Sequence, residues 1–369
     1  MDPKILPQSV SEENNQLRFT LSGLNVSIAN SLRRVILSDI DTVVFKTYNE
    51  EVNKCTITTN TTAFNNEIIK QRLGCIPVYI SDLEMPLQNY VVEVDVENNT
   101  DTIQYVTTKD FKVRNTTTDT YLSENDRQNI FPPCDQTGYY IDFVRLKPKL
   151  SDTIPGEAIN LTCEFSIGNA KENGMFNVVS ACAYGNTVDD VKQEIELNKK
   201  KKEWKDQGLS PADIKYESEN WRLLDGLRIT KKDSYDFLVE SVGVFTNQEI
   251  CHKGCDVIIA KMNAVDVQID DDNLEIVESN TTMKNSFDIT IKNEDYTIGK
   301  TLEYMLYTKF YEGAEILSFC GFKKVHPHDS DSIIRLAYND VIDKSSIKGH
   351  VKTCLQELIQ VYEKIKKSI

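Results

Sequence analysis

The sequence contains no run of about 18 apolar residues, the length that a helix needs to cross a bilayer. Its first residues carry no positively charged segment followed by an apolar one, so we expect neither a membrane span nor a signal peptide. Basic residues are also scarce, because 42 Lys and Arg stand against 57 Asp and Glu and give a formal net charge of −15. Since Lys and Arg drive binding to phosphate backbones, this charge argues against direct binding to duplex nucleic acid.

Recognisable enzyme motifs are absent as well: the sequence has no Walker A segment, Gly-rich dinucleotide fingerprint, HExxH or GxSxG. Cysteine is present without a pattern. The nine cysteines are an odd number at irregular spacing, which favours free thiols in a reducing, intracellular compartment. With 369 residues, 40% of them apolar, the chain is long enough for two or three domains. We predict a folded, non-enzymatic protein without a cofactor.

An amphipathic helix is predicted over residues 25–37. Asn25 or Ser27 can accept hydrogen bonds from the free N–H groups of the first turn. The spacing i, i+4, i+7 and i+8 then places four apolar side chains on one stripe, with two arginines on its flank. The stripe consists of Ile28, Leu32, Val35 and Ile36, and the arginines are Arg33 and Arg34.

A weaker copy of this helix is predicted over residues 295–306, displaced by 270 positions. In this register Ser27 aligns with Thr297, and the small residue Ala29 aligns with the equally small Gly299. The apolar stripe of the second helix consists of Ile298, Leu302, Met305 and Leu306. A repeated amphipathic helix predicts two related modules whose stripes bury against each other.

Each predicted module has the same order of elements: a strand, a capped helix, further strands and a long final helix. In the first module, strands are predicted over 17–21, where Leu17, Phe19 and Leu21 alternate with polar residues, over 41–48 and over 235–245. Its long helix is predicted over 247–266, and the apolar face of that helix consists of Cys251, Cys255, Ile258, Met262 and Val265. From about residue 79 to 184, short β-like runs separated by Asn, Thr, Asp, Gly and Pro indicate a strand-rich insert. Acidic residues precede Lys199–Lys202 in the segment 188–207, an order that suits a solvated helix. The sequence therefore predicts an α+β chain of two dimerisation modules, the first interrupted by an insert. The boundaries are 1–48 and 185–270 for the first module, 49–184 for the insert, and 271–369 for the second module.

Several segments resemble, in order, the α-like subunits of multisubunit DNA-dependent RNA polymerases: the bacterial α N-terminal domain, the archaeal D subunit and the third subunit of eukaryotic polymerase II. These segments are residues 25–37, 66–77 (with its Arg-Leu-Gly-x-Ile-Pro pattern) and 237–243. The C-terminal module is similar to the smaller partner, the archaeal L subunit or the eleventh subunit of polymerase II. Its matching segments are residues 287–291, 294–302, 319–322 and 326–327.

The resemblance implies that two α-like modules, normally separate chains, are fused here, as in the polymerases of large DNA viruses of eukaryotes. The implied role is a non-catalytic assembly platform that docks the largest and second-largest polymerase subunits, together with small zinc-binding subunits. Arg33, Arg34 and Arg72 are the implied partner contacts. The implied location is the virion and host cytoplasm for a viral protein, and otherwise the nucleus. No metal is inferred, because the cysteines of the first 184 residues are dispersed; in the insert region they include Cys55, Cys75, Cys134 and Cys163.

Two alternatives come from other functional classes. The first is a metal- or thiol-dependent enzyme, because thiolate and imidazole groups are common metal ligands and nucleophiles. Its candidate residues are Cys251, His252, Cys255, His326 and His328. The second alternative is direct binding of nucleic acid through Lys199–Lys202. Core packing of the cysteines, a loop around the histidines and a solvated helix are the structural explanations that compete with them.

Overall fold

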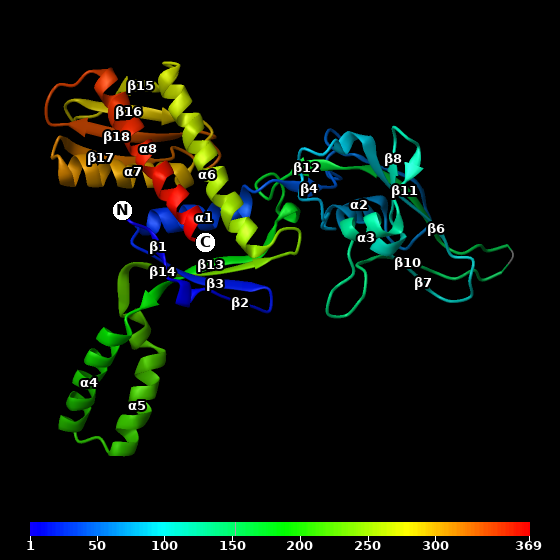
Figure 1. Cartoon of the computed structure of the whole chain (residues 1–369), viewed down its shortest axis with the longest axis horizontal. Helices are drawn as coiled ribbons and strands as arrows, with labels where there is room; N and C mark the ends of the chain where they lie inside the picture. Colours follow the sequence, from blue (N-terminus) through cyan, green and yellow to red (C-terminus); the bar gives the residue numbers. More distant parts are fainter. Residues whose placement is uncertain (152) are drawn as a thin grey trace. The chain divides into compact units, whose positions relative to one another are not determined.

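The computed structural model describes residues 1–151 and 153–369, which form two compact units that we treat separately. The first unit comprises Met1–Val35, Ala181–Glu240 and Cys251–Ile369, and the second comprises Ile36–Ser180 and Ser241–Ile250. Both contain helices and antiparallel sheets (Figure 1). The predicted α+β class is therefore confirmed. In the part of the chain described, no helix combines the length and the apolar character needed to cross a membrane.

One sheet of the first unit is built from strands at three distant places in the sequence. Its order is β1 (Lys4–Ile5), β3 (Gln16–Ser22), β14 (Thr230–Ser241) and β13 (Val179–Val188), and β2 (Ser11–Glu13) also pairs with β3. The alternating pattern predicted for β3 is confirmed, because Leu17, Phe19 and Leu21 are buried. Phe19 lies opposite Phe237 on β14, and their rings stack at 5.1 Å. Strand β14 begins and ends a few residues earlier than the predicted 235–245.

Two helices accompany this sheet, α1 (Val26–Ser38) and α6 (Asn247–Asp270), and both were predicted. The apolar face predicted for α6 is confirmed, since its side chains are almost completely excluded from solvent. They are Cys251, Cys255, Ile258, Met262 and Val265. Helix α6 runs four residues beyond the predicted end, so Asp270, the first residue of the acidic segment, is also the last residue of the helix.

The C-terminal segment, residues 271–369, contributes a four-stranded antiparallel sheet and two further helices to the first unit (Figure 1). The strand order is β15 (Glu275–Glu278), β16 (Ser286–Ile291), β18 (Ser332–Tyr338) and β17 (Leu317–Lys323). The helices are α7 (Tyr296–Leu306), which continues into the π-helix η6 (Tyr307–Gly313), and α8 (Lys344–Ser368). Strand β17 and η6 were not predicted as such, because neither has a clean apolar alternation.

Close packing fixes α7 against β17. An added Cβ at Gly299 would lie 1.9 Å from the ring of Phe322, so only glycine fits at this position of the helix. On the other face of the sheet Arg335 of β18 makes a two-pronged ion pair with Asp288 of β16, at 2.6 Å for each nitrogen–oxygen pair. This guanidinium holds the pKa of the Asp288 carboxyl below its usual value, assisted by a hydrogen bond from Ser279.

A helical hairpin connects β13 with β14 and consists of α4 (Asp190–Asp206) and α5 (Pro211–Leu223) (Figure 1). The solvated helix predicted from residues 188–207 is confirmed as α4, in which Leu197 is the buried residue. Helix α5 was missed, although Ser210 and Asp213 form a capping box at its start. Its one buried residue is Ser218, so no apolar stripe marks it in the sequence.

The second unit is rich in strands, as residues 79–184 predicted. Its main sheet has the order β5 (Cys55–Asn60), β11 (Ala158–Glu164), β6 (Tyr90–Glu97), β8 (Lys112–Asn115) and β9 (Thr120–Tyr121). Two small sheets pair β10 (Asp142–Leu146) with β7 (Gln104–Thr107), and β12 (Ser166–Gly168) with β4 (Thr42–Val44). The helices are α2 (Asn66–Gly74) and α3 (Glu124–Ile130). Since β4 belongs here, this unit begins earlier in the sequence than the predicted insert, and the strand predicted over 41–48 is only three residues long.

Candidate functional site

The two helices related by the predicted 270-residue repeat begin in the same way. In α1, Asn25 Oδ1 accepts a hydrogen bond from Ser27 N at 2.9 Å. In α7, Asp295 Oδ1 accepts the corresponding bond from Thr297 N at 2.8 Å. Asn25, rather than Ser27, is therefore the cap of the first helix, and Asp295 is its equivalent 270 residues later. Such a cap satisfies a backbone donor that has no partner inside the helix.

The equivalence continues along both helices. Ser31 Oγ donates to Ile28 O at 2.8 Å, and Thr301 Oγ1 donates to Ile298 O at the same distance. All eight stripe residues are buried: seven have no exposed surface and Met305 has 8%. They are Ile28, Leu32, Val35 and Ile36 on α1, and Ile298, Leu302, Met305 and Leu306 on α7.

The long helices α6 and α8 repeat each other too, with a shift of 100 residues. Residues 251–260 and 351–360 share the same succession of buried, half-buried and exposed positions except at one place. Cys255 corresponds to Leu355, and Met262 corresponds to Tyr362, all of them buried. The first unit thus contains two capped helices that begin alike and two long helices whose burial follows a common pattern.

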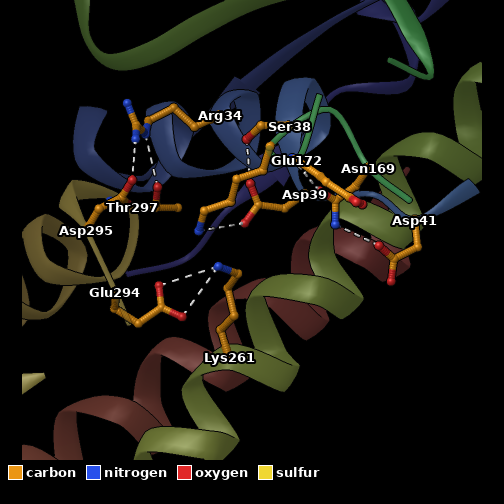
Figure 2. A network of polar contacts seen from close by, with 11 residues as sticks. Arg34, Ser38, Asp39, Asp41, Asn169, Glu172, Lys261, Glu294, Asp295 and Thr297 are labelled. Carbon is orange, nitrogen blue, oxygen red and sulfur yellow. Dashed lines mark hydrogen bonds and ion pairs between the residues drawn. The ribbon is translucent and has the colours of Figure 1, made fainter. Parts of the chain in front are cut away.

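Polar contacts connect α1 with both helices of the C-terminal segment. The hydroxyl of Ser31 shares a hydrogen bond with the hydroxyl of Tyr362 on α8, and both residues are buried. Arg34 donates from Nη2 to Asp295 Oδ2 at 2.8 Å and from Nε to Thr297 Oγ1 at 3.0 Å. Figure 2 shows this guanidinium reaching the first turn of α7. Arg34 therefore contacts the very carboxylate that caps α7.

A series of ion pairs joins α6 to α8. Asp256 pairs with Lys366 at 2.6 Å, and Lys352 pairs with both Asp266, at 3.8 Å, and Asp270. The pairs involve later residues of α6 and earlier residues of α8 in turn, so the two helices run antiparallel. Exposed ion pairs contribute only about 0–1 kcal/mol each, and their main effect here is to favour one register of the two helices.

A more buried pair lies closer to the start of α7. Lys261 of α6 contacts the carboxylate of Glu294 at 3.4 Å, and both side chains are at most 19% exposed (Figure 2). Breaking a buried pair leaves an uncompensated charge, which costs more free energy than losing an exposed pair. Glu294 and Asp295 thus connect the residues just before α7 to both α6 and α1.

The other two arginines proposed as partner contacts lie differently. Arg33 donates to the side chain of Asn30 on its own helix, at 2.9 and 3.0 Å, and remains half-buried. Arg72, in the second unit, donates to the backbone oxygens of Phe143 and Asp142, at 2.7 and 2.8 Å. All three arginines are therefore already engaged within the chain, and Arg34 is the one that reaches the C-terminal segment.

The residues of the enzyme alternative do not assemble into a site. Cys251 and Cys255 lie on the buried face of α6, where burial raises the pKa of Cys255 to about 12 and disfavours the nucleophilic thiolate. His326 and His328 lie on an exposed loop, where His328 N donates to His326 Nδ1. Among residues 1–151 and 153–369, no group of three or more His, Cys, Asp or Glu side chains is placed to hold a metal ion.

The lysine run of the second alternative is largely balanced by carboxylates on its own helix. Lys199 pairs with Glu196 at 2.6 Å and Lys200 pairs with Glu203 at 2.8 Å. Lys201 lies 3.9 Å from a further carboxylate, that of Glu194. These contacts favour the solvated helix over a phosphate-binding patch.

Sequence reasoning placed Tyr362 on the apolar side of the final helix. It did not identify the contact of Tyr362 with Ser31, the α6–α8 ion pairs or the capping role of Asp295. The signal for the ion pairs was present, since acidic residues recur along α6 and lysines recur along α8 at helical spacing. Which acid meets which lysine depends on the direction and register of the two helices, and neither follows from the spacing alone.

Comparison with known proteins finds similarity to subunits of RNA polymerases. The chain is 32% identical over 88 residues to the DNA-directed RNA polymerases I and III subunit rpac1 of Dictyostelium discoideum, which covers 23% of this chain and 24% of the relative. It is 25% identical over 217 residues to the DNA-directed RNA polymerase subunit Rpo3 of Picrophilus torridus, covering 56% of this chain and 72% of the relative. A conjugation stage-specific protein of Tetrahymena thermophila is 23% identical over 303 residues, or 70% of this chain and 92% of that protein.

The chain therefore spans about a quarter of the length of the Dictyostelium relative and nearly all of the Tetrahymena one. A family match extends over residues 18–262, from β3 to the middle of α6, and is described as the RNA polymerase Rpb3/Rpb11 dimerisation domain. This match covers well over half of the chain, including α1 with its cap and buried stripe. The chain belongs to the Rpb3/Rpb11 dimerisation domain family of RNA polymerase subunits.

Proposed function

We propose that this protein is a non-catalytic subunit of a DNA-directed RNA polymerase that pairs two α-like modules within one polypeptide and docks the two largest subunits. The first module comprises residues 1–48 and 185–270, residues 49–184 are its insert, and residues 271–369 are the second module. The observation that carries the proposal is the repeated geometry of α1 and α7. Each begins with an equivalent cap, buries an equivalent stripe and repeats the same hydroxyl contact 270 residues apart.

The contacts between the segments support intramolecular pairing. Arg34 meets the cap of α7, Ser31 meets Tyr362 of α8, and antiparallel ion pairs join α6 to α8. Residues 271–369 lie outside the family match over residues 18–262, and we assign to them the role of the partner module. A fused pair requires no second chain to cover the stripe of α1.

The proposed partners follow from the names of the relatives, which are RNA polymerase subunits. Arg33 and Arg72 are proposed to contact the large subunits, because a guanidinium has five N–H donors and can bind a carboxylate with those that are not used within the chain. Arg34 is assigned mainly to the contact with Asp295. Small zinc-binding subunits are further proposed partners. We assign the protein to the site of transcription, which is the virion and host cytoplasm for a virus and the nucleus otherwise.

Co-purification tests the proposal directly. A tagged full-length chain is expressed in its native source, and the proteins that remain bound after washing are identified by mass spectrometry. We expect the largest and second-largest polymerase subunits among them. Recovery of the chain alone from cells with active polymerase would contradict the proposed role.

Matched variants test whether assembly depends on the two buried stripes. Leu32→Asp and Leu302→Asp each place a carboxylate in a fully buried stripe, where an unpaired charge is strongly unfavourable. Both are expected to abolish co-purification. Val26→Asp is the control, because Val26 is 45% exposed at the start of α1 and tolerates a polar residue. Assembly of the two stripe variants at the level of the control would overturn the assigned role of the stripes.

A further inference from the structure

Two buried cysteines lie opposite each other at the edge of the main sheet of the second unit. Strand β5 is the edge strand and pairs with β11. In their antiparallel register Cys55 is the direct partner of Cys163. The two residues are 2% and 1% exposed, although they are more than 100 positions apart in the sequence.

The backbone hydrogen bonds identify the kind of pair that these cysteines form. The side-chain amide of Asn53 accepts from Cys55 N at 3.2 Å and donates to Cys55 O at 3.0 Å, so both backbone groups of Cys55 point away from β11. The next pair along the ladder is bonded, because Glu164 N donates to Lys54 O at 3.2 Å. Bonded and non-bonded pairs alternate in an antiparallel ladder, which makes Cys55 and Cys163 a non-hydrogen-bonded pair.

This kind of pair brings side chains close together. The Cα atoms of a non-hydrogen-bonded pair are typically about 4.5 Å apart. This distance lies at the short end of the roughly 4.4–6.8 Å between the Cα atoms of disulfide-bonded cysteines. Hydrogen bonding by the neighbouring Cys163 thiol lowers the pKa of Cys55, and the nearby ammonium of Lys70 acts in the same direction. Cys55 is therefore the thiol that ionises first.

We propose that Cys55 and Cys163 are a redox-modification site, at which a reversible disulfide fastens the edge strand β5 to β11. The oxidant is a small disulfide such as oxidised glutathione. The Cys55 thiolate attacks one of its sulfur atoms and releases one glutathione thiolate. Cys163 then attacks the mixed disulfide at Cys55 and releases the second. The two thiol protons end on the two glutathione molecules, and the protein has lost two hydrogens.

The position of the bridge gives it a mechanical consequence. Among the described residues β5 has one neighbour in the sheet, β11, and the chain continues from β5 through a short turn into α2, which carries Arg72. Opening of β5 exposes Cys55 to the oxidant, and the bridge then prevents further opening. The bridge thus controls how freely the edge strand and the segment after it move. This inference does not depend on the proposed polymerase role.

The test uses the full-length chain in graded mixtures of oxidised and reduced glutathione. After alkylation of free thiols and digestion without reductant, mass spectrometry identifies linked peptides. We expect a peptide that joins Cys55 to Cys163, and its loss on adding dithiothreitol. We also expect slower amide hydrogen exchange in β5 of the oxidised protein than of the reduced protein.

One control variant shows whether the exposed cysteines contribute to the bridge. Cys75 and Cys134 are the exposed cysteines, so the double variant Cys75→Ser with Cys134→Ser should form the bridge as readily as the wild type. The inference is overturned if Cys55 stops at the glutathione adduct, if no linked peptide forms, or if the double variant loses it. An unchanged exchange rate in β5 after bridging would overturn the mechanical consequence.

Discussion

Removing one leucine from either stripe should destabilise the whole first unit. Leu32 of α1 and Leu302 of α7 are equivalent in the 270-residue repeat, and neither has any exposed surface. Leu→Ala at a fully buried site costs about 2–5 kcal/mol, because the lost burial and the residual cavity add. For a unit of this size, each kcal/mol lowers Tm by about 2–4 °C, so each variant should melt about 4–20 °C below the wild type.

Hydrogen exchange shows whether the two leucines belong to one cooperative structure. Leu32 and Leu302 lie in the same compact unit, together with the sheet that contains β3. Leu302→Ala should therefore speed amide exchange in β3 about as much as Leu32→Ala does, although position 302 is far from β3 in the sequence. Val341→Ala is the control, since Val341 is 90% exposed and should change stability by less than about 0.5 kcal/mol.

The opposite result would be equally clear. If Leu302→Ala accelerated exchange only within residues 271–369 and left β3 unchanged, the C-terminal segment would fold by itself. Two separate thermal transitions, each affected by one variant alone, would lead to the same conclusion. Either outcome would refute the reasoning that the two stripes stabilise a single unit.

Three further predictions concern single contacts of the first unit. Arg34→Ala should lower the free energy of chemical unfolding by about 0.5–1 kcal/mol, because its ion pair with Asp295 is about one-third exposed. In an Asp295→Asn background the same substitution should have no effect, because the ion pair is already absent. Gly299→Ala should lower Tm, because the Phe322 ring leaves no room for a Cβ at this position. Gly349→Ala in α8 has open space for the Cβ and should raise the free energy of unfolding by up to about 1 kcal/mol. Equal effects of the two substitutions would contradict the packing of α7 against β17. The pKa of Asp288 is lowered in the folded protein, so the ionised carboxylate stabilises the fold above its unfolded-state pKa of about 3.9. This contribution is lost as the pH falls through the folded-state pKa. In urea titrations, Asp288→Asn should therefore be less stable than the wild type at pH 6, and the two should converge in strong acid.

The sequence predicted the helical part of the site well because the period of a buried stripe is a direct consequence of helix geometry. Leu32 and Leu302 could be aligned before any contact was known, since both occur in an apolar pattern after a polar cap. The choice between Asn25 and Ser27 could not be made, because either side chain is able to cap and only the backbone geometry selects one.

Elements without a clean pattern were missed for physical reasons. Helix α5 has no apolar stripe. In strand β17, the ring of Phe319 packs over Gly321, and a glycine interrupts the apolar alternation that marks a strand in the sequence. Contacts between distant segments were beyond sequence reasoning altogether. The pairing of Cys55 with Cys163 depends on the register of two strands, and the contact of Arg34 with Asp295 depends on how α1 meets α7.

The central claim is that one polypeptide supplies both α-like modules of a polymerase. Native mass spectrometry of the purified polymerase tests it most directly, because it counts the copies of each chain. We predict one copy of this protein per complex, together with one largest and one second-largest subunit, and no separate small α-like chain. Two copies of this protein, or a separate small α-like chain bound beside it, would contradict the account.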